Sequence, residues 1–226
     1  MSAGPSMTTA NAGVAGKLDP ELFARREANG AARFADGRAK RVIDVLASTL
    51  LLCLSLPFWP MLALLVKASS RGAVFYGQAR VGKDGRLFTL RKFRSMIRRA
   101  EENGALWAGE RDPRITPVGF VLRRLHLDEL PQLLNVLRGE MSLVGPRPER
   151  PQFVRELAAR IPDYQLRHLV KPGITGWAQV NYPYASSVEA SREKLAWDLF
   201  YVFHADMALD MKILFGTFRA IFRWRE

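Results

Sequence analysis

The sequence predicts a mostly helical membrane protein with one small β-hairpin. Three observations lead to this fold class. An uncharged run of 22 residues extends from Val45 to Val66. Apolar residues recur with helical period through much of the chain that follows. Two short β-prone runs flank the dipeptide Asp84-Gly85, which favours a tight hairpin turn.

These observations divide the chain into three expected parts. Residues 1–38 are rich in Ala and Gly, lack apolar periodicity and are expected to form a flexible tail, with at most a short helix over 20–28. Residues 39–71 are expected to form a re-entrant helical hairpin in a membrane. Residues 72–226 are expected to form a second domain that ends in an interfacial amphipathic helix.

The charge balance points to an anionic partner. The chain has 34 Lys and Arg against 22 Asp and Glu, with a net charge of +12. Nucleic acid, a lipid surface and phosphorylated substrates all fit such a charge. No recognisable nucleic-acid-binding module is present, so nucleic acid is not expected. Cys53 is the single cysteine, and the three histidines are scattered, which excludes an intramolecular disulfide and disfavours a zinc site.

The uncharged run is expected to bend within the membrane. A straight helix over it would reach roughly 33 Å, enough to cross a bilayer. However, Pro57 and Pro60 stand in its middle, where each removes a backbone donor. Basic residues flank both ends, so the positive-inside tendency places both ends on the same side. A hairpin that bends at the prolines satisfies both facts; a kinked single-pass anchor and a buried core helix are the alternatives.

The next stretch predicts a β-hairpin, with residues 74–79 paired with 86–90. Basic side chains accumulate directly after it, Lys92 and Arg94 among them. Most of these side chains are expected to face solvent or lipid. One or two suit phosphate, whose oxygens basic side chains bind well.

The stretch from Arg123 to Glu149 is the centre of the sequence. Asp128 and Glu129 are adjacent, just ahead of Pro131 and an apolar run that stops at Gly139. Asp128 is therefore expected at the N-cap of a helix that runs to about residue 138. Capping alone would explain both carboxylates. A functional interpretation is also open. Because sequence neighbours do not face each other on a helix, the two carboxylates suit separate roles on an anionic substrate.

The remaining segments predict two helices, a loop and a terminal amphipathic helix. Helices are expected over 152–160 and 189–203, with a loop-like stretch between them. Gly-rich backbone near Lys171 is suited to approach a phosphate there. The last segment combines an apolar face, basic residues and Trp224, which fits a helix in the membrane interface. Packing on the protein's own core is the alternative, and the same face suits a homodimer.

Five blocks carry a resemblance to a known family. KFRSM, DPRIT, LDELPQLLNVLRGEMSLVGPRPE, KPGITGWAQVN and WDLFYV resemble, in this order, the signature blocks of the bacterial sugar transferases. These are the monotopic phosphoglycosyl transferases, also called polyprenyl-phosphate hexose-1-phosphate transferases. The resemblance runs from about Lys40 to the C-terminus, and the chain is similar to the short, single-module members.

The resemblance implies a reaction and a location. Members transfer a sugar 1-phosphate from a UDP-sugar to undecaprenyl phosphate and release UMP, with Mg²⁺ as cofactor. They work at the cytoplasmic face of the bacterial inner membrane, which supplies anionic phospholipid, and start the assembly of exopolysaccharide, capsule or O-antigen. A membrane-anchored assembly protein that kept the fold without the chemistry is the competing expectation.

The resemblance also implies residue roles. Asp128 would carry a covalent phosphosugar, Glu129 would help to bind the metal or handle a proton, and both would lie at the metal. Arg147 would lie on the nucleotide side of the site. Three further residues match basic positions of the family: Arg123, Lys92 and Arg94. The chain departs from many members at Leu56, which replaces Ser ahead of the hairpin proline, and at His126, also commonly Ser.

Overall fold

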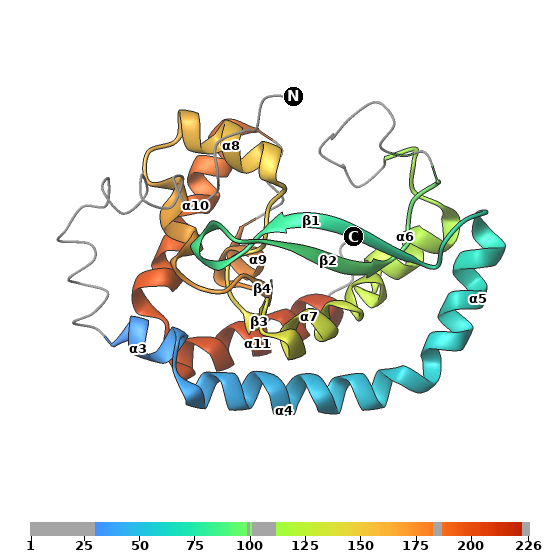
Figure 1. Cartoon of the computed structure of the whole chain (residues 1–226), viewed down its shortest axis with the longest axis horizontal. Helices are drawn as coiled ribbons and strands as arrows, with labels where there is room; N and C mark the ends of the chain where they lie inside the picture. Colours follow the sequence, from blue (N-terminus) through green and yellow to red (C-terminus); the bar gives the residue numbers. More distant parts are fainter. Residues whose placement is uncertain (1–29, 99, 101–111, 183–186, 223–226) are drawn as a thin grey trace, which may run out of the picture.

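The computed structural model describes residues 30–98, 100, 112–182 and 187–222 (Figure 1). The helix expected within 20–28 lies outside these residues. The helices are α3 (Ala31–Ala35), α4 (Arg38–Ser55), α5 (Trp59–Ser69), α6 (Pro117–Arg124), α7 (Gln132–Arg138), α8 (Pro151–Arg160), α9 (Trp177–Asn181), α10 (Val188–His204) and α11 (Met207–Phe222). The strands are β1 (Phe75–Val81), β2 (Leu87–Phe93), β3 (Ser142–Val144) and β4 (Gly173–Thr175). The mostly helical fold class is thereby confirmed.

The uncharged run lies within α4 and α5, which one 3₁₀ turn, η1 (Leu56–Phe58), joins. Pro57 lies in this turn, and Pro60 lies in the first turn of α5, where a missing N–H is tolerated. The chain changes direction at this turn, so that α5 rises away from the line of α4 (Figure 1). Of the described residues, Ala31–Ser69 form the stretch that is long and apolar enough to cross a membrane.

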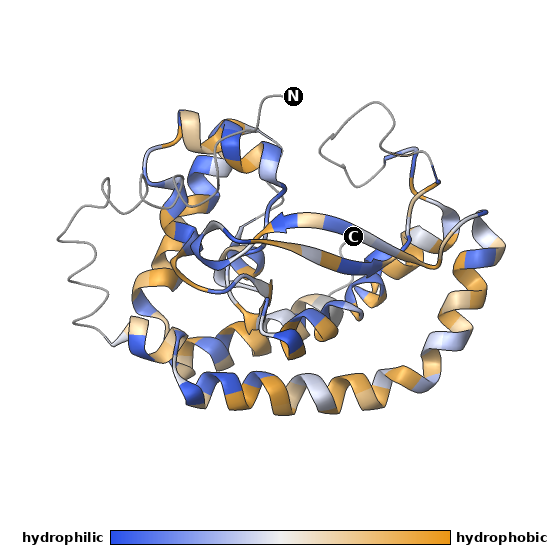
Figure 2. Ribbon diagram, in the orientation of Figure 1, coloured by the Kyte–Doolittle hydropathy of each residue, from blue (hydrophilic) through white to orange (hydrophobic). Residues whose placement is uncertain are grey.

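One side of this helical stretch is uncovered. Only 11% of its most apolar window is buried inside the molecule, which argues against a buried core helix. Apolar colour continues along α4 and α5 in Figure 2. The exposed apolar side chains on α4, η1 and α5 are Val42, Leu46, Leu50, Leu51, Leu54, Leu56, Phe58, Met61, Leu64 and Leu65.

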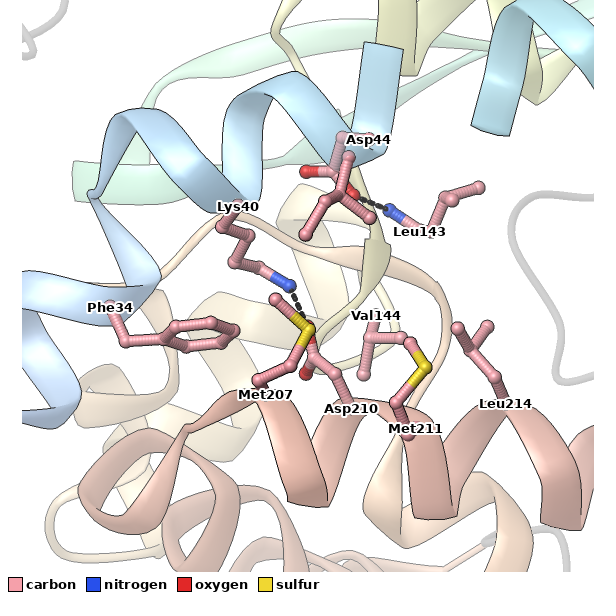
Figure 3. Close-up of a pocket in the computed structure, with 10 residues that line it drawn as sticks. Phe34, Lys40, Asp44, Leu143, Val144, Met207, Asp210, Met211 and Leu214 are labelled. Carbon is pink, nitrogen blue, oxygen red and sulfur yellow. Dashed lines mark hydrogen bonds and ion pairs between the residues drawn. The ribbon is translucent and has the colours of Figure 1, made fainter. Parts of the chain in front are cut away.

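The other side of α4 is fastened to the rest of the protein by buried polar contacts. Lys40 Nζ donates to Asp210 Oδ2 on α11 at 2.5 Å. Asp44 Oδ1 accepts from Ser142 Oγ and from the Leu143 backbone N–H, each at 3.0 Å. Figure 3 shows Lys40, Asp44, Leu143 and Asp210 around a small cavity between α4 and α11. Because buried charges are tolerated only when paired, these contacts fix which face of α4 turns inward.

Residues 31–35 form a packed helix, although a flexible tail was expected over residues 1–38. Ala31 and Ala35 on α3 are buried in the main core cluster with Tyr201 and Val202 of α10. Small side chains allow this close packing, and their lack of apolar periodicity explains why the sequence pattern gave no signal there.

The predicted β-hairpin is confirmed and is longer than expected. β1 and β2 pair antiparallel from Phe75 opposite Phe93 to Val81 opposite Leu87. In the connection between the strands, Asp84 and Gly85 both have positive φ, 55° and 74°, as this turn dipeptide favours.

The loop-like stretch after α8 proved to be more structured than predicted. It contains η4 (Tyr164–Leu169), β4 and α9. β4 pairs in parallel with β3, with Ser142 opposite Gly173 and Val144 opposite Thr175. The helices predicted over 152–160 and 189–203 are confirmed as α8 and α10.

The terminal helix α11 has an inner and an outer face. Ile213 is fully buried in the core, whereas Phe215 and Phe218 are 70% and 61% exposed. Core packing and an uncovered apolar face therefore coexist on this helix.

Candidate active site

The two central carboxylates lie in a tight turn ahead of a helix, and Asp128 is not the expected N-cap. His126 has a left-handed backbone, and the 3₁₀ turn η3 (Leu127–Glu129) follows it. α7 begins only at Gln132, with Pro131 as its N-cap residue. Pro131 has no N–H, so it cannot donate the hydrogen bond that the third residue of a helix gives to its N-cap side chain. The helix ends at Gly139 with positive φ, as predicted.

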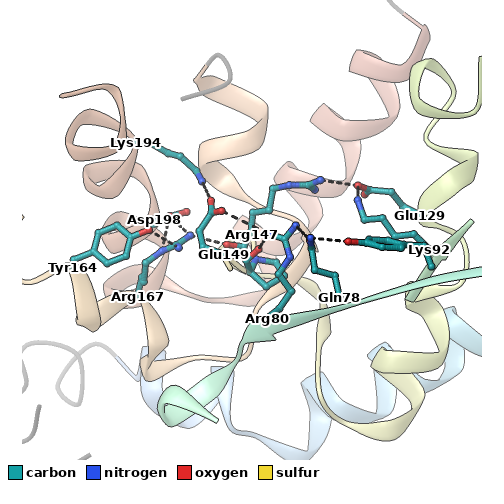
Figure 4. A network of polar contacts seen from close by, with 12 residues as sticks. Gln78, Arg80, Lys92, Glu129, Arg147, Glu149, Tyr164, Arg167, Lys194 and Asp198 are labelled. Carbon is teal, nitrogen blue, oxygen red and sulfur yellow. Dashed lines mark hydrogen bonds and ion pairs between the residues drawn. The ribbon is translucent and has the colours of Figure 1, made fainter. Parts of the chain in front are cut away.

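Glu129 is held by two cations from other parts of the chain. Its Oε1 accepts from Lys92 Nζ of β2 at 2.6 Å and from Arg147 Nη2 at 2.7 Å (Figure 4). Burial alone would raise the pKa of Glu129, but Arg147 and Lys92 bring it well below its ordinary value. Glu129 is therefore ionised at neutral pH. Burial lowers the pKa of Lys92, with Arg147 acting in the same direction and Glu129 opposing it.

Asp128 has a different environment from its neighbour. It is 4% exposed, and its carboxylate has no hydrogen bond or ion pair with another residue that the structure describes. Burial raises its pKa, an effect that the nearby Lys92, Arg123 and Arg147 oppose. One carboxylate is thus committed to cations while the other is uncommitted, which is how neighbouring carboxyl groups take different roles.

Arg123 belongs to the same cationic surroundings. Its Nε donates to Ser95 Oγ at 2.8 Å, which joins α6 to the segment after β2. Hydrogen bonds from Arg114 bring the pKa of Asp112 to about 2, and Arg123 adds to this effect. The structure therefore gathers four predicted site residues around Asp128: Glu129, Lys92, Arg123 and Arg147.

Arg94 and Lys171 are not part of this group. Arg94 lies just past the end of β2, and its Nη2 donates to the Ser70 carbonyl at 2.6 Å, at the end of α5. Lys171 Nζ lies near Gly139 and Arg41, and burial lowers its pKa, with Arg41 adding to the effect. Arg94 thus binds the end of α5, and Lys171 lies beside the end of α7. The structure therefore does not support the phosphate-binding role that was expected of these two residues.

Arg147 is positioned by a residue that was not predicted from the sequence, Arg167. Arg167 of η4 is buried, and its Nη2 donates to the Arg147 carbonyl and to Asp198 Oδ2, each at 2.8 Å. Its Nη1 donates to the Tyr164 hydroxyl at 3.1 Å. An arginine within a loop-like stretch gives no local signal of burial, and its partners are distant in sequence. Gly145 also restricts the path of the loop before Arg147. A Cβ at this position would lie 2.3 Å from the Lys171 carbonyl oxygen, so only glycine fits there.

Glu149 connects the loop that carries Arg147 to Lys194 of α10, and its pKa makes the stability depend on pH. Burial would raise its pKa, but Lys194, Arg167 and Arg80 bring it to about 2. A carboxyl group whose pKa is lower in the folded than in the unfolded protein stabilises the fold at pH values above its unfolded pKa. This stabilisation is lost as the pH falls through the folded pKa.

We expect the Glu149→Gln variant to have an unfolding free energy about 3 kcal/mol lower than wild type at pH 7. Denaturant unfolding should show the difference shrinking from about pH 4.5 towards pH 2; a gap that persists at low pH would contradict it.

Asp128 and Glu129 are the oxygen donors that a divalent cation would meet at this site. No cluster of three or more His, Cys, Asp or Glu side chains occurs among the described residues. Asp128 has uncommitted oxygens, and both cations on Glu129 bind its Oε1, which leaves Oε2 for another partner. Mg²⁺ is commonly held by one or two carboxylates, with waters and substrate phosphates as its other ligands. The two side chains therefore fit Mg²⁺.

The chain belongs to the bacterial sugar transferase family, whose model matches residues 35–224. One relative, from Aeromonas hydrophila, is a UDP-N-acetylgalactosamine-undecaprenyl-phosphate N-acetylgalactosaminephosphotransferase. It is 46% identical over 80% of this chain and 43% of its own length. An Escherichia coli relative is a UDP-glucose:undecaprenyl-phosphate glucose-1-phosphate transferase, 43% identical over 79% of this chain and 39% of its own length. A Caulobacter vibrioides protein of the same name is 40% identical over 87% of this chain and 74% of its own length. The chain thus spans about two fifths of the first two relatives.

Proposed function

We propose that this protein is a phosphoglycosyl transferase. It transfers a sugar 1-phosphate from a UDP-sugar to undecaprenyl phosphate and releases UMP, the first membrane step in assembling an exopolysaccharide, capsule or O-antigen. The observation that carries the proposal is the uncommitted, buried Asp128 beside the cation-held Glu129. The names of the similar proteins support this choice of donor and acceptor.

In the proposed mechanism, an Asp128 oxygen attacks the phosphorus that carries the sugar. The bond from this phosphorus to the bridging oxygen breaks, and UMP leaves with the electron pair. The resulting acyl phosphate is reactive, so an oxygen of undecaprenyl phosphate attacks the same phosphorus and frees Asp128. Direct transfer to the acceptor, without the acyl phosphate, is the alternative mechanism.

The surrounding charges suit the developing negative charge on the phosphates. Lys92, Arg147 and Arg123 approach from three different segments, so their positions do not depend on one flexible loop. Preorganised cations of this kind stabilise charge that develops in a transition state. Mg²⁺ bound at Asp128 and Glu129 would supply further positive charge to offset the diphosphate.

The proposed location is the cytoplasmic face of the inner membrane. The uncovered apolar faces of α4, α5 and α11 suit the hydrocarbon layer. The net charge of +12 favours anionic phospholipid headgroups. A homodimer would be an alternative cover for the outer face of α11.

The reaction is tested by measuring UMP release. Protein in detergent micelles is given undecaprenyl phosphate, MgCl₂ and, in turn, the UDP derivatives of glucose, galactose, N-acetylglucosamine and N-acetylgalactosamine. We expect turnover with at least one donor and none without the acceptor lipid or with EDTA. Folded protein that is silent with every donor would sink the proposed donor class and favour a non-catalytic assembly protein.

Cysteine labelling tests the re-entrant hairpin. In a Cys53→Ser background, Ala39→Cys and Arg71→Cys place single exposed thiols in the first turn of α4 and just after α5. We expect a membrane-impermeant maleimide to label both in inverted vesicles and neither in intact spheroplasts, because both ends carry cations that favour the cytoplasmic side. Arg192→Cys, exposed on α10, is the matched cytoplasmic control. Labelling of the two thiols from opposite sides would show a spanning anchor instead.

A further inference from the structure

Gln132 carries a buried hydrogen-bond donor that the protein itself does not use. The side chain is 2% exposed, and its Nε2 has no hydrogen-bond partner. A buried amide without a partner destabilises a fold, whereas an apolar side chain of the same shape would not. Such a group in a native structure therefore calls for an explanation, and a ligand acceptor is one.

The local backbone places Gln132 on the side of the turn that carries Glu129. The Glu129 N–H donates to the His126 carbonyl, and the next hydrogen bonds also connect residues three apart. Side chains three apart eclipse one another in such a turn. Both η3 and α7 pack on β2, where Glu129 meets Lys92.

Asn135, three residues further on, shows what a structural amide looks like on this face. Its Nδ2 donates to the Thr89 carbonyl of β2 at 2.8 Å and to Glu140 at 2.6 Å. Its Oδ1 accepts from the Arg91 N–H at 3.2 Å. Gln132 lies between Glu129 and Asn135 in this series, yet its amide nitrogen has no such partner. Packing of α7 on β2 therefore explains why a buried amide stands at Asn135, but it does not explain the buried amide of Gln132.

We propose that Gln132 is a further substrate-binding residue, whose amide donates to a phosphoryl oxygen of the donor diphosphate held beside Asp128 and Glu129. This inference rests on the proposed function, which supplies the diphosphate. Gln132 follows Glu129 by three residues in a segment whose hydrogen bonds connect residues three apart, so the two side chains lie on the same side of the turn. A phosphoryl oxygen supplies the missing acceptor, and hydrogen bonds to charged groups are the stronger ones. Because the amide is neutral, it can donate to the substrate without forming an ion pair with Glu129, as Lys92 and Arg147 do.

Gln132→Met and Gln132→Leu test this assignment, with Gln152→Met, exposed on α8, as the matched control. Thermal unfolding without ligand is measured first. The dissociation constants of UDP and of inorganic pyrophosphate, each with MgCl₂, follow by calorimetry. We expect an unchanged or higher Tm in the Gln132 variants, because they remove an unpaired polar group. Both dissociation constants should rise about 10- to 100-fold, the range for a lost hydrogen bond to a charged group.

Each other result overturns the inference in a distinct way. A lower Tm in both Gln132 variants would mean that the amide is paired in the free protein. Unchanged dissociation constants for both probes would remove Gln132 from the binding site. Weaker UDP binding with unchanged pyrophosphate binding would move the contact to the nucleoside. Wild-type protein that binds neither probe would overturn the proposed donor class and the inference with it.

Discussion

Replacing Asp128 by asparagine is expected to lower UMP release on the order of 10³-fold or more, because the amide cannot serve as the attacking oxygen nucleophile. The folded protein should keep its Tm. Asp128 makes no hydrogen bond or ion pair with the described residues, and burial already raises its pKa. A neutral side chain of the same shape therefore loses no native contact.

A labelled donor separates the covalent mechanism from direct transfer. With label on the phosphate next to the sugar and no acceptor lipid, wild-type protein should become labelled and Asp128→Asn should not. Asp163→Asn, at an exposed turn, is the matched control and should behave as wild type. Label retained by Asp128→Asn would place the nucleophile elsewhere. Turnover of wild type without any labelled protein would favour direct transfer.

Local patterns predicted the parts of the fold that depend on neighbouring residues. The uncharged run with Pro57 and Pro60 became α4, η1 and α5, and Asp84-Gly85 became the hairpin connection. In each case the backbone preference and the apolar pattern agree over a few residues. Gly139 ended α7 for the same reason.

Long-range contacts account for what the sequence did not predict. β3 and β4 are three residues each and lie about 30 positions apart, so neither has a recognisable strand pattern. Charge alone indicated that basic residues would surround the site, but not which ones. Lys92 reaches Glu129, whereas Arg94, two positions later, lies past the end of β2 and bonds the end of α5. Where a strand ends, its alternation no longer predicts direction.

The buried ion pair between Arg167 and Asp198 is the second place where a single change should have a large effect. Both side chains are almost fully enclosed, with 2% and 3% exposed, and their shortest distance is 2.8 Å. Arg167→Met should lower the unfolding free energy by about 3–5 kcal/mol, because it leaves the Asp198 charge buried and unpaired. For a domain of this size the Tm should fall by about 6–20 °C.

A double variant and a surface control show whether the unpaired charge is the cause. Arg167→Met with Asp198→Leu removes both charges and should recover much of the lost Tm, since apolar replacement of a whole buried pair is often neutral. Arg160→Met, which breaks an exposed pair with Glu156, should change the unfolding free energy by less than about 0.5 kcal/mol.

The same double variant also tests how the site is held. Arg167 donates to the Arg147 carbonyl, and this contact stays lost when the charges are removed together. We therefore expect the double variant to regain stability without regaining full UMP release, because Arg147 would no longer be fixed beside Glu129. Recovery of both properties would mean that Gly145 and the remaining contacts of the loop are sufficient to position Arg147.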